Sequence, residues 1–132
     1  MQNVEWQPFV NLIQAAASAA GDVTQDDDFW LDTRAAKVVI LTIEMLYASA
    51  AGSPDLVIEY SDDPSIGLWH VAWQRSRYDP SNEEGTYLVT LLRQVQVGKP
   101  FHLGSSLRWR VTGFATSTDP TEVGFRILAT LQ

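Results

Sequence analysis

The two histidines, His70 and His102, are the residues whose chemical type best suits acid–base or metal chemistry. A Ser-His-Asp mechanism needs a histidine beside a nucleophile, and no GxSxG or similar elbow surrounds any serine. The chain has no cysteine, which excludes cysteine nucleophiles, zinc–thiolate sites and disulfide bonds. It also has no Walker loop, GxGxxG or HExxH motif. We therefore expect a protein that is not an enzyme, with no catalytic residues and no cofactor.

Acidic side chains are grouped at 26–28, 62–63 and 83–84. The two carboxylates of a glycoside hydrolase must face each other across a substrate, and sequence neighbours on loops do not imply that arrangement. Carboxylate oxygens suit calcium, but the DxDxDG spacing of a calcium loop is absent. Runs of this kind are typical of solvated loops, so we predict no metal site.

Three arginines form a candidate basic stripe. Arg108 and Arg110 are two residues apart on one face of an alternating segment, and we place Arg126 on a neighbouring strand. Such a stripe could bind an acidic protein surface or a sugar acid. The alternative is that these arginines form the solvent-facing half of amphipathic strands.

Length and charge restrict the class of protein further. The 132 residues carry a formal net charge of −7, and we predict one domain over residues 1–132. A surface this acidic repels nucleic acid and suits a basic partner surface. The N-terminus has no signal-peptide pattern, and no apolar window is long enough to span a bilayer. We expect no nucleic-acid or membrane partner, and assembly in a cytoplasm.

The pattern along the chain predicts an all-β protein. All six prolines fall between apolar runs, and regular spacing of turns and short apolar segments indicates a sandwich or barrel. We predict an antiparallel, jelly-roll-like β-sandwich of about seven or eight strands. The segments that suggest strands are 29–31, 36–48, 55–60, 68–75, 86–97, 101–103, 107–112 and 123–131.

Residues 9–20 admit two structures. Their alanines favour a short N-terminal helix, with Gly21 as its C-cap. A strand over Val10 to Ala16 is the competing interpretation, which we favour because the segments that follow all resemble strands.

Two predicted strand regions are central. In the hairpin Asp55–Arg75, the turn Ser61–Gly67 joins two alternating arms, and Trp69, Val71 and Trp73 share one face that we assign to the core rather than to a ligand platform. The segment 36–48 is apolar on both faces, which suits a strand covered by a partner. Candidate interface residues are Val38, Ile40, Arg108, Arg110 and Arg126.

The hairpin LVIEYSDDPSIGLWHVAWQ resembles a pattern in virion proteins of tailed bacteriophages and prophages: an alternating strand, Ser-Asp, a short glycine-containing turn and then Trp. A segment such as LIQAAASAAG precedes it in those proteins, and a strand such as LRWRV and an alternating final strand follow. The turn here is longer and richer in proline than their usual Ser-Asp-Gly type.

This resemblance implies a structural part of a virion, such as a head decoration, head-completion or tail-associated protein. It also implies a homo-oligomer that contacts capsid or tail proteins and is assembled in the host cytoplasm. The alternative is a carbohydrate-binding β-sandwich, in which Trp6, Trp30 and Tyr78 would stack on sugar rings.

Overall fold

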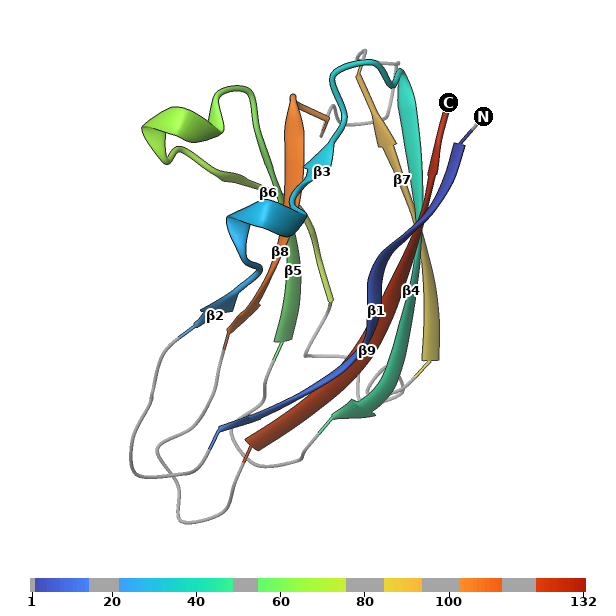
Figure 1. Ribbon diagram of the computed structural model, residues 1–132. Helices are drawn as coiled ribbons and strands as arrows, with labels where there is room; N and C mark the ends of the chain where they lie inside the picture. The colour runs from blue at the N-terminus through green and yellow to red at the C-terminus, as the bar shows by residue number, and fades with distance from the viewer. Residues whose placement is uncertain (1, 15–21, 49–54, 76–84, 94–102, 113–120) are drawn as a thin grey trace.

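A computed structural model describes residues 2–14, 22–48, 55–75, 85–93, 103–112 and 121–132 (Figure 1). Two antiparallel sheets, one of four strands and one of five, pack face to face in this part of the chain. The described elements are strands and two short 3-10 helices. The prediction of an all-β antiparallel sandwich is confirmed.

The four-stranded sheet contains the long strands. Its order is β1 (Gln2–Gln14), β9 (Thr121–Leu131), β4 (Val38–Ala48) and β7 (Gly85–Leu92). The two termini lie side by side because Gln2 is opposite Leu131 in the β1–β9 pair (Figure 1).

The five-stranded sheet carries the shorter strands and both 3-10 helices. Its order is β2 (Val23–Thr24), β8 (Ser106–Thr112), β5 (Asp55–Ser61) and β6 (His70–Gln74), and β3 (Leu31–Asp32) also pairs with β8. The helix η1 (Asp27–Phe29) separates β2 from β3, and η2 (Pro64–Ile66) lies between β5 and β6.

The strand pairing is that of a jelly roll. Outer pairs enclose inner pairs along the chain: β1 with β9, β2 and β3 with β8, β4 with β7, and β5 with β6. The strands β2 and β3 pair with successive parts of β8, so together they fill one strand position that η1 interrupts. Because of this interruption, the described part of the chain contains nine strands, compared with the predicted seven or eight.

One apolar core lies between the sheets. Alternate residues of each strand point inward, as the period of two in a β-strand requires. Phe125 and Ile127 are fully buried, and Trp109 packs edge-on against Phe125 with ring centroids 5.1 Å apart. Burying one such side chain stabilises the fold by about 1.5–3 kcal/mol. The largest fully buried side chains are Phe125, Leu41, Ile43, Leu56, Ile58, Leu91, Leu103, Leu107, Ile127, Val39, Val57 and Val111.

The N-terminal segment is a strand where the structure describes it. Strand β1 covers Gln2–Gln14, so the favoured strand is confirmed for residues 10–14 and the helix alternative is wrong for residues 9–14. Residues 15–20 lie outside the described chain. Its hydrogen bonding to β9 continues as far as Gln14 opposite Thr121. Pairing with a long neighbouring strand overrides the local helix preference of this sequence.

Two other predicted boundaries change. Phe29 belongs to η1 rather than to a strand, because the Asp26 side chain accepts a hydrogen bond from the Asp28 amide and starts a 3-10 turn. Strand β7 ends at Leu92, and residues 94–102 lie outside the described chain.

The predicted Trp stripe is split between the two faces of the sheet. Strand β6 has a bulge, because Trp73 is opposite Ile58 whereas Val71 is opposite Glu59, which leaves Ala72 as an extra residue. Ala72 and Trp73 therefore pack on the core, whereas Val71 is 47% exposed on the outer face. The prediction that Trp69, Val71 and Trp73 share one core face is wrong, and the bulge is the reason.

Candidate functional site

The outer face of the four-stranded sheet carries aliphatic side chains. Val38 and Ile40 are half-buried on this face of β4, while Val39 and Leu41 point into the core. Leu92 lies opposite Val38, and Leu88, 74% exposed, lies opposite Thr42 on β7. We call this set the aliphatic face; its members are Val38, Ile40, Leu88, Leu92 and Leu128.

Arg126 lies at the margin of the aliphatic face. It is opposite Glu44, and its Nη2 and Nε donate to the same Glu44 oxygen, Oε2, at 2.7 and 3.1 Å. These hydrogen bonds, followed by the charge of Glu44, raise the pKa of Arg126 above its ordinary value. The predicted placement of Arg126 beside Arg108 is wrong, because β9 and β8 belong to different sheets.

Arg108 and Arg110 do share one face of β8, as predicted, but carboxylates of the same chain surround them. Glu59, 6% exposed, lies between them: Arg108 Nε is 2.9 Å from Oε1 and Arg110 Nε is 3.3 Å from Oε2. Arg110 also contacts Asp22 at 2.6 Å. Burial lowers the pKa of Arg110, but the hydrogen bond to Asp22 and the charge of Glu59 outweigh it, and the net shift is upward. The arginines therefore form part of a charge-balanced network on this sheet.

Two tryptophans lie over this network. The rings of Trp30 and Trp69 meet edge to face, with centroids 4.8 Å apart and planes at 70°. The Arg108 guanidinium lies 4.2 Å from the centre of the Trp69 ring, a cation–π distance. Trp30 Nε1 donates to the Gln25 carbonyl at 3.2 Å, which fixes its ring.

The aromatics proposed for sugar stacking are not on one surface. Trp6 is 6% exposed, lies in the core and donates through Nε1 to the Phe29 carbonyl at 3.0 Å. Trp30 is half-buried, and Tyr78 lies outside the described residues. Trp6 therefore offers no exposed ring to a ligand.

A second ionic contact was not foreseen from the sequence. Asp55, 1% exposed, accepts from Arg75 Nε at 3.2 Å and from Gln74 Nε2 at 2.9 Å. Arg75 is itself 5% exposed. These bonds connect the start of β5 to the end of β6 and have a structural role.

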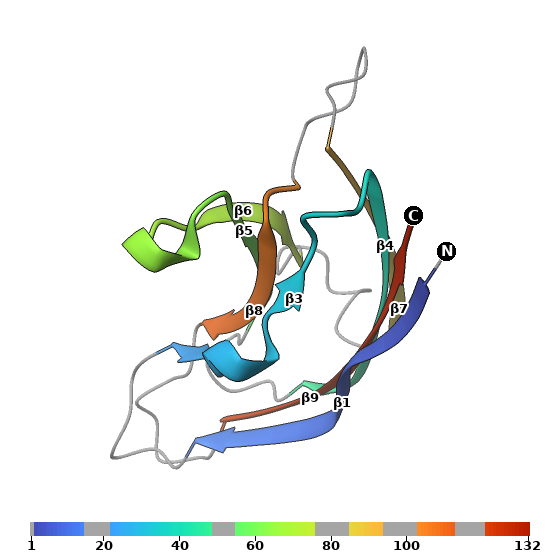
Figure 2. The same ribbon diagram turned by 45° about the horizontal axis from the view of Figure 1, so that its top comes forward.

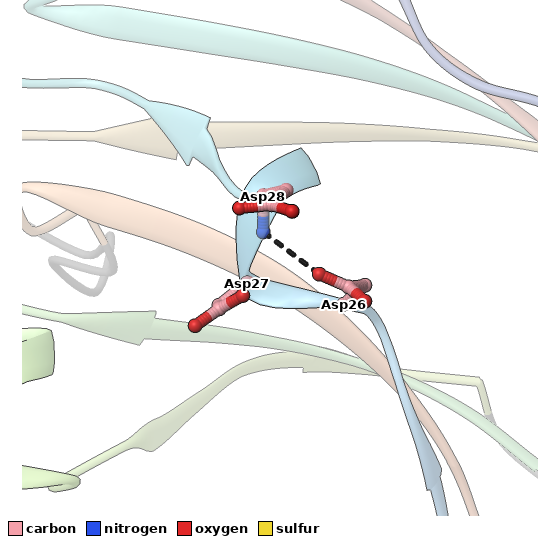
Figure 3. Close-up of side chains that lie close together, drawn as sticks. All are labelled: Asp26, Asp27 and Asp28. Atoms are coloured by element: carbon pink, nitrogen blue, oxygen red, sulfur yellow. Dashed lines mark hydrogen bonds between the residues drawn. The ribbon is translucent and has the colours of Figure 1, made fainter.

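The remaining candidates for chemistry stand apart from one another. His70 is exposed at the start of β6 with its ring 5.3 Å from that of Tyr60, and His102 lies outside the described residues. Asp26, Asp27 and Asp28 are exposed, and Figure 3 shows their side chains spreading from η1. Three of their carboxylate oxygens lie within 4.8 Å of one another, but Asp26 already caps η1 through the Asp28 amide.

A cavity of about 610 Å³ opens where β1 begins and β9 ends. Its apolar lining includes Val4, Leu31 and Leu131. Asp32 and Arg34 form an exposed ion pair of 2.7 Å in its wall, and the hydrogen bond from Arg34 lowers the pKa of Asp32 to about 2. The described residues that line it include no nucleophile with an adjacent base.

Comparison with known proteins adds no relative: no protein-family model, curated protein or solved structure matches this chain. No helix in the described part of the chain is long and apolar enough to cross a membrane.

Proposed function

We propose that this chain is a non-enzymatic structural protein of a phage virion or phage-like particle, assembled in the host cytoplasm. Its role there would be head decoration, head completion or association with the tail, through contacts with capsid or tail proteins. The jelly roll supports this proposal because it recurs in viral capsid proteins, although it also occurs in lectin domains. The choice between these functions therefore depends on the surfaces of the sheets.

The aliphatic face carries the proposal. The outer face of an antiparallel sheet is ordinarily polar when it meets water. Here Leu88 is 74% exposed, and Val38, Ile40 and Leu128 are half-buried on the same face. Thr42 lies between Leu88 and Leu128, and Thr90 and Thr130 lie on either side of Ile40, so threonines interleave with the aliphatic side chains. Large apolar side chains exposed on one sheet face mark an interaction site. Packing this face against another protein would remove these side chains from water, which supports an assembly role.

The proposed occupant of the aliphatic face is a second copy of the chain. Four strands about 4.8 Å apart, each contributing about seven residues, present roughly 400 Å² of flat surface. Two copies stacked face to face would bury about 800 Å², which is below the roughly 1,000 Å² expected of a stable interface. A twofold arrangement satisfies both copies at once, and it is the commonest symmetry of homo-oligomers. Further contacts with a capsid or tail lattice would add to this area.

The mass of the purified protein in solution tests this proposal. We expect light scattering after size-exclusion chromatography to show a homo-oligomer, and Leu88→Asp to shift the mass toward the monomer. Leu68→Asp is the matched control, because Leu68 is 54% exposed but precedes β6 in the other sheet. An unchanged mass for Leu88→Asp, or a monomeric wild type at its highest soluble concentration, would refute self-assembly through this face.

The carbohydrate-binding alternative depends on the half-buried Trp30–Trp69 pair. It predicts binding on a glycan array that Trp69→Ala abolishes. If the protein is strictly monomeric and Trp69→Ala abolishes its glycan binding, carbohydrate binding replaces the virion proposal.

A further inference from the structure

The five-stranded sheet carries an apolar patch of its own, away from the aliphatic face. Among the described residues, the exposed large apolar side chains include Phe29 at 65%, Ile66 at 68%, Leu68 at 54% and Val71 at 47%. They come from η1, η2 and β6, and both views draw η1 and η2 projecting from the same flank of this sheet (Figures 1 and 2). We call this set, together with half-buried Trp30 and Trp69, the turn patch.

Contacts between side chains join the two halves of the turn patch. The Trp30 ring, next to η1, packs on the Trp69 ring, next to β6, at 4.8 Å. Arg108 lies against the Trp69 ring at 4.2 Å and against the Trp30 ring at 6.0 Å, and its Nε donates to Glu59. Val71 lies opposite the same Glu59 in the sheet. The Trp pair and Arg108 therefore connect the η1 side of the patch to the β6 side.

The turns that present the apolar side chains are themselves well defined. Asp63 Oδ1 accepts from the Ser65 amide at 3.1 Å at the start of η2. Gly67 ends η2 with a φ of 71°, a left-handed conformation that glycine adopts without strain. Exposed groups held in place by caps lose little conformational entropy on binding, which favours a preformed docking surface.

The rim of the turn patch is acidic. Asp26, Asp27 and Asp28 flank Phe29, and Asp62 and Asp63 precede η2; all of these aspartates are exposed. The nearest arginines on β8, Arg108 and Arg110, are held by Glu59 and Asp22. An apolar centre with an exposed acidic rim complements a protein surface with an apolar centre and a basic rim.

From this complementarity, we infer that the turn patch docks a protein partner that presents aromatic or aliphatic side chains surrounded by Lys and Arg. A second copy would bring the same carboxylates against one another, and like charges in contact disfavour pairing. Anionic lipid and nucleic acid are repelled for the same reason. This inference does not depend on the virion proposal, because it concerns the other sheet and a different partner.

Selection from a displayed random peptide library on the full-length protein provides the probe. We expect selected peptides to combine Trp, Phe or Leu with Lys and Arg. A synthetic selected peptide should bind wild type and Leu88→Asp equally, and bind Leu68→Asp at least about tenfold more weakly. If circular dichroism shows that Leu68→Asp is not folded, Ile66→Asp serves as the second variant.

The acidic rim has its own test. Replacing Asp26, Asp27 and Asp28 together by Asn keeps side chains that can cap η1 while removing the charge. We expect roughly threefold weaker peptide binding at low salt and little difference at high salt, because salt screens exposed charges.

Five outcomes would overturn the inference. The first is that no peptide is selected, the second is that the selected peptides lack basic residues, and the third is that they bind Leu68→Asp as tightly as wild type. The fourth is a lower oligomer mass for Leu68→Asp, which would indicate a second copy. The last is binding of phosphatidylglycerol vesicles that Leu68→Asp abolishes, which would indicate a membrane.

Discussion

Two Glu–Arg pairs, one on each sheet, allow the effect of burial on an ion pair to be measured within one molecule. Glu59 is directly opposite Arg108, and Glu44 is directly opposite Arg126, both in antiparallel pairs. The side chains of the first pair are 7% and 19% exposed, and those of the second are 26% and 38% exposed. The perturbation that we consider is Glu→Gln at each position, which removes the charge and keeps the shape.

The hydrogen bonds of the two glutamates also differ. Arg108 approaches Oε1 of Glu59 while Arg110 approaches Oε2, so a Gln amide at this position would turn its NH₂ group toward one of the arginines. Glu44 accepts both of its bonds through Oε2 alone, so a Gln carbonyl can replace that oxygen. We expect Glu59→Gln to lower the free energy of unfolding by about 2 kcal/mol, since it weakens charged hydrogen bonds in a buried setting. Glu44→Gln should cost about 0.5 kcal/mol, the usual value for an exposed pair.

Urea unfolding at one fixed protein concentration, followed by tryptophan fluorescence and far-ultraviolet circular dichroism, measures both values. For a chain of 132 residues, 2 kcal/mol corresponds to a fall in Tm of about 7 °C and 0.5 kcal/mol to about 2 °C. The urea slope m should stay constant in both variants. Equal losses, or a larger loss for Glu44→Gln, would refute the argument that burial and acceptor geometry decide the strength of these pairs.

Two further predictions concern a glycine position and a carboxyl pKa. A Cβ at Gly104 would lie 2.5 Å from the backbone oxygen of Ser61, whereas a Cβ at Gly67 meets nothing within 4 Å. We expect Gly104→Ala to lower the free energy of unfolding by about 3 kcal/mol, because the backbone must move. Gly67→Ala should lower it by about 1 kcal/mol, because of the positive φ at this position. Urea unfolding that ranks the two variants in the opposite order would contradict this expectation. The pKa of Asp32 is lowered from 3.8 to about 2 by Arg34, so the stability that this pair adds is present above pH 4 and lost as the pH falls through 2. An NMR titration should give a midpoint near 2 for Asp32 and a higher one in Arg34→Gln, which loses the guanidinium but keeps the backbone amide that also donates to Asp32. Equal midpoints would rule out the Arg34 side chain as the cause.

The sandwich could be predicted from the sequence because its long strands show the period of two clearly. Val123, Phe125, Ile127 and Ala129 are all buried in β9, and they alternate with Arg126, Leu128 and Thr130, which are half-buried. The segment 36–48 is apolar on both faces because one side of β4 is core and the other belongs to the aliphatic face. Alternation reports which residues share a face, and in these strands that information was sufficient.

The errors have a common physical cause, which is that partner strands decide details that local pattern cannot. The bulge in β6 changes the face of Val71 relative to Trp73, and it arises from the pairing of β6 with β5. For residues 9–14 the strand is the favoured interpretation, and pairing with β9 explains why the helix alternative fails. The split of one jelly-roll strand into β2 and β3 likewise depends on their separate contacts with β8.

The arginine network shows the same limit at the candidate site. The sequence places Arg108 and Arg110 on one face, but the position of Glu59 beside both follows only from the β5–β8 register. A signal was present, since Glu59 interrupts an otherwise largely apolar strand, and an acidic residue there needs a basic neighbour. This signal could not show which arginine would be the neighbour of Glu59.

The two outer faces therefore differ in a way that composition alone hides. On the five-stranded sheet, Glu59 and Asp22 neutralise Arg108 and Arg110, so the exposed charge beside the turn patch is negative. On the four-stranded sheet, the outer face combines aliphatic side chains with Thr90 and Thr130, which lie on either side of Ile40, and its charges are of both signs, on Glu5, Glu44 and Arg126. A face whose charges are of both signs tolerates an identical copy, whereas a face with an acidic rim disfavours one. The proposed self-pairing and the proposed contact with a basic partner therefore use different sheets, so a substitution on one face should leave binding at the other unchanged.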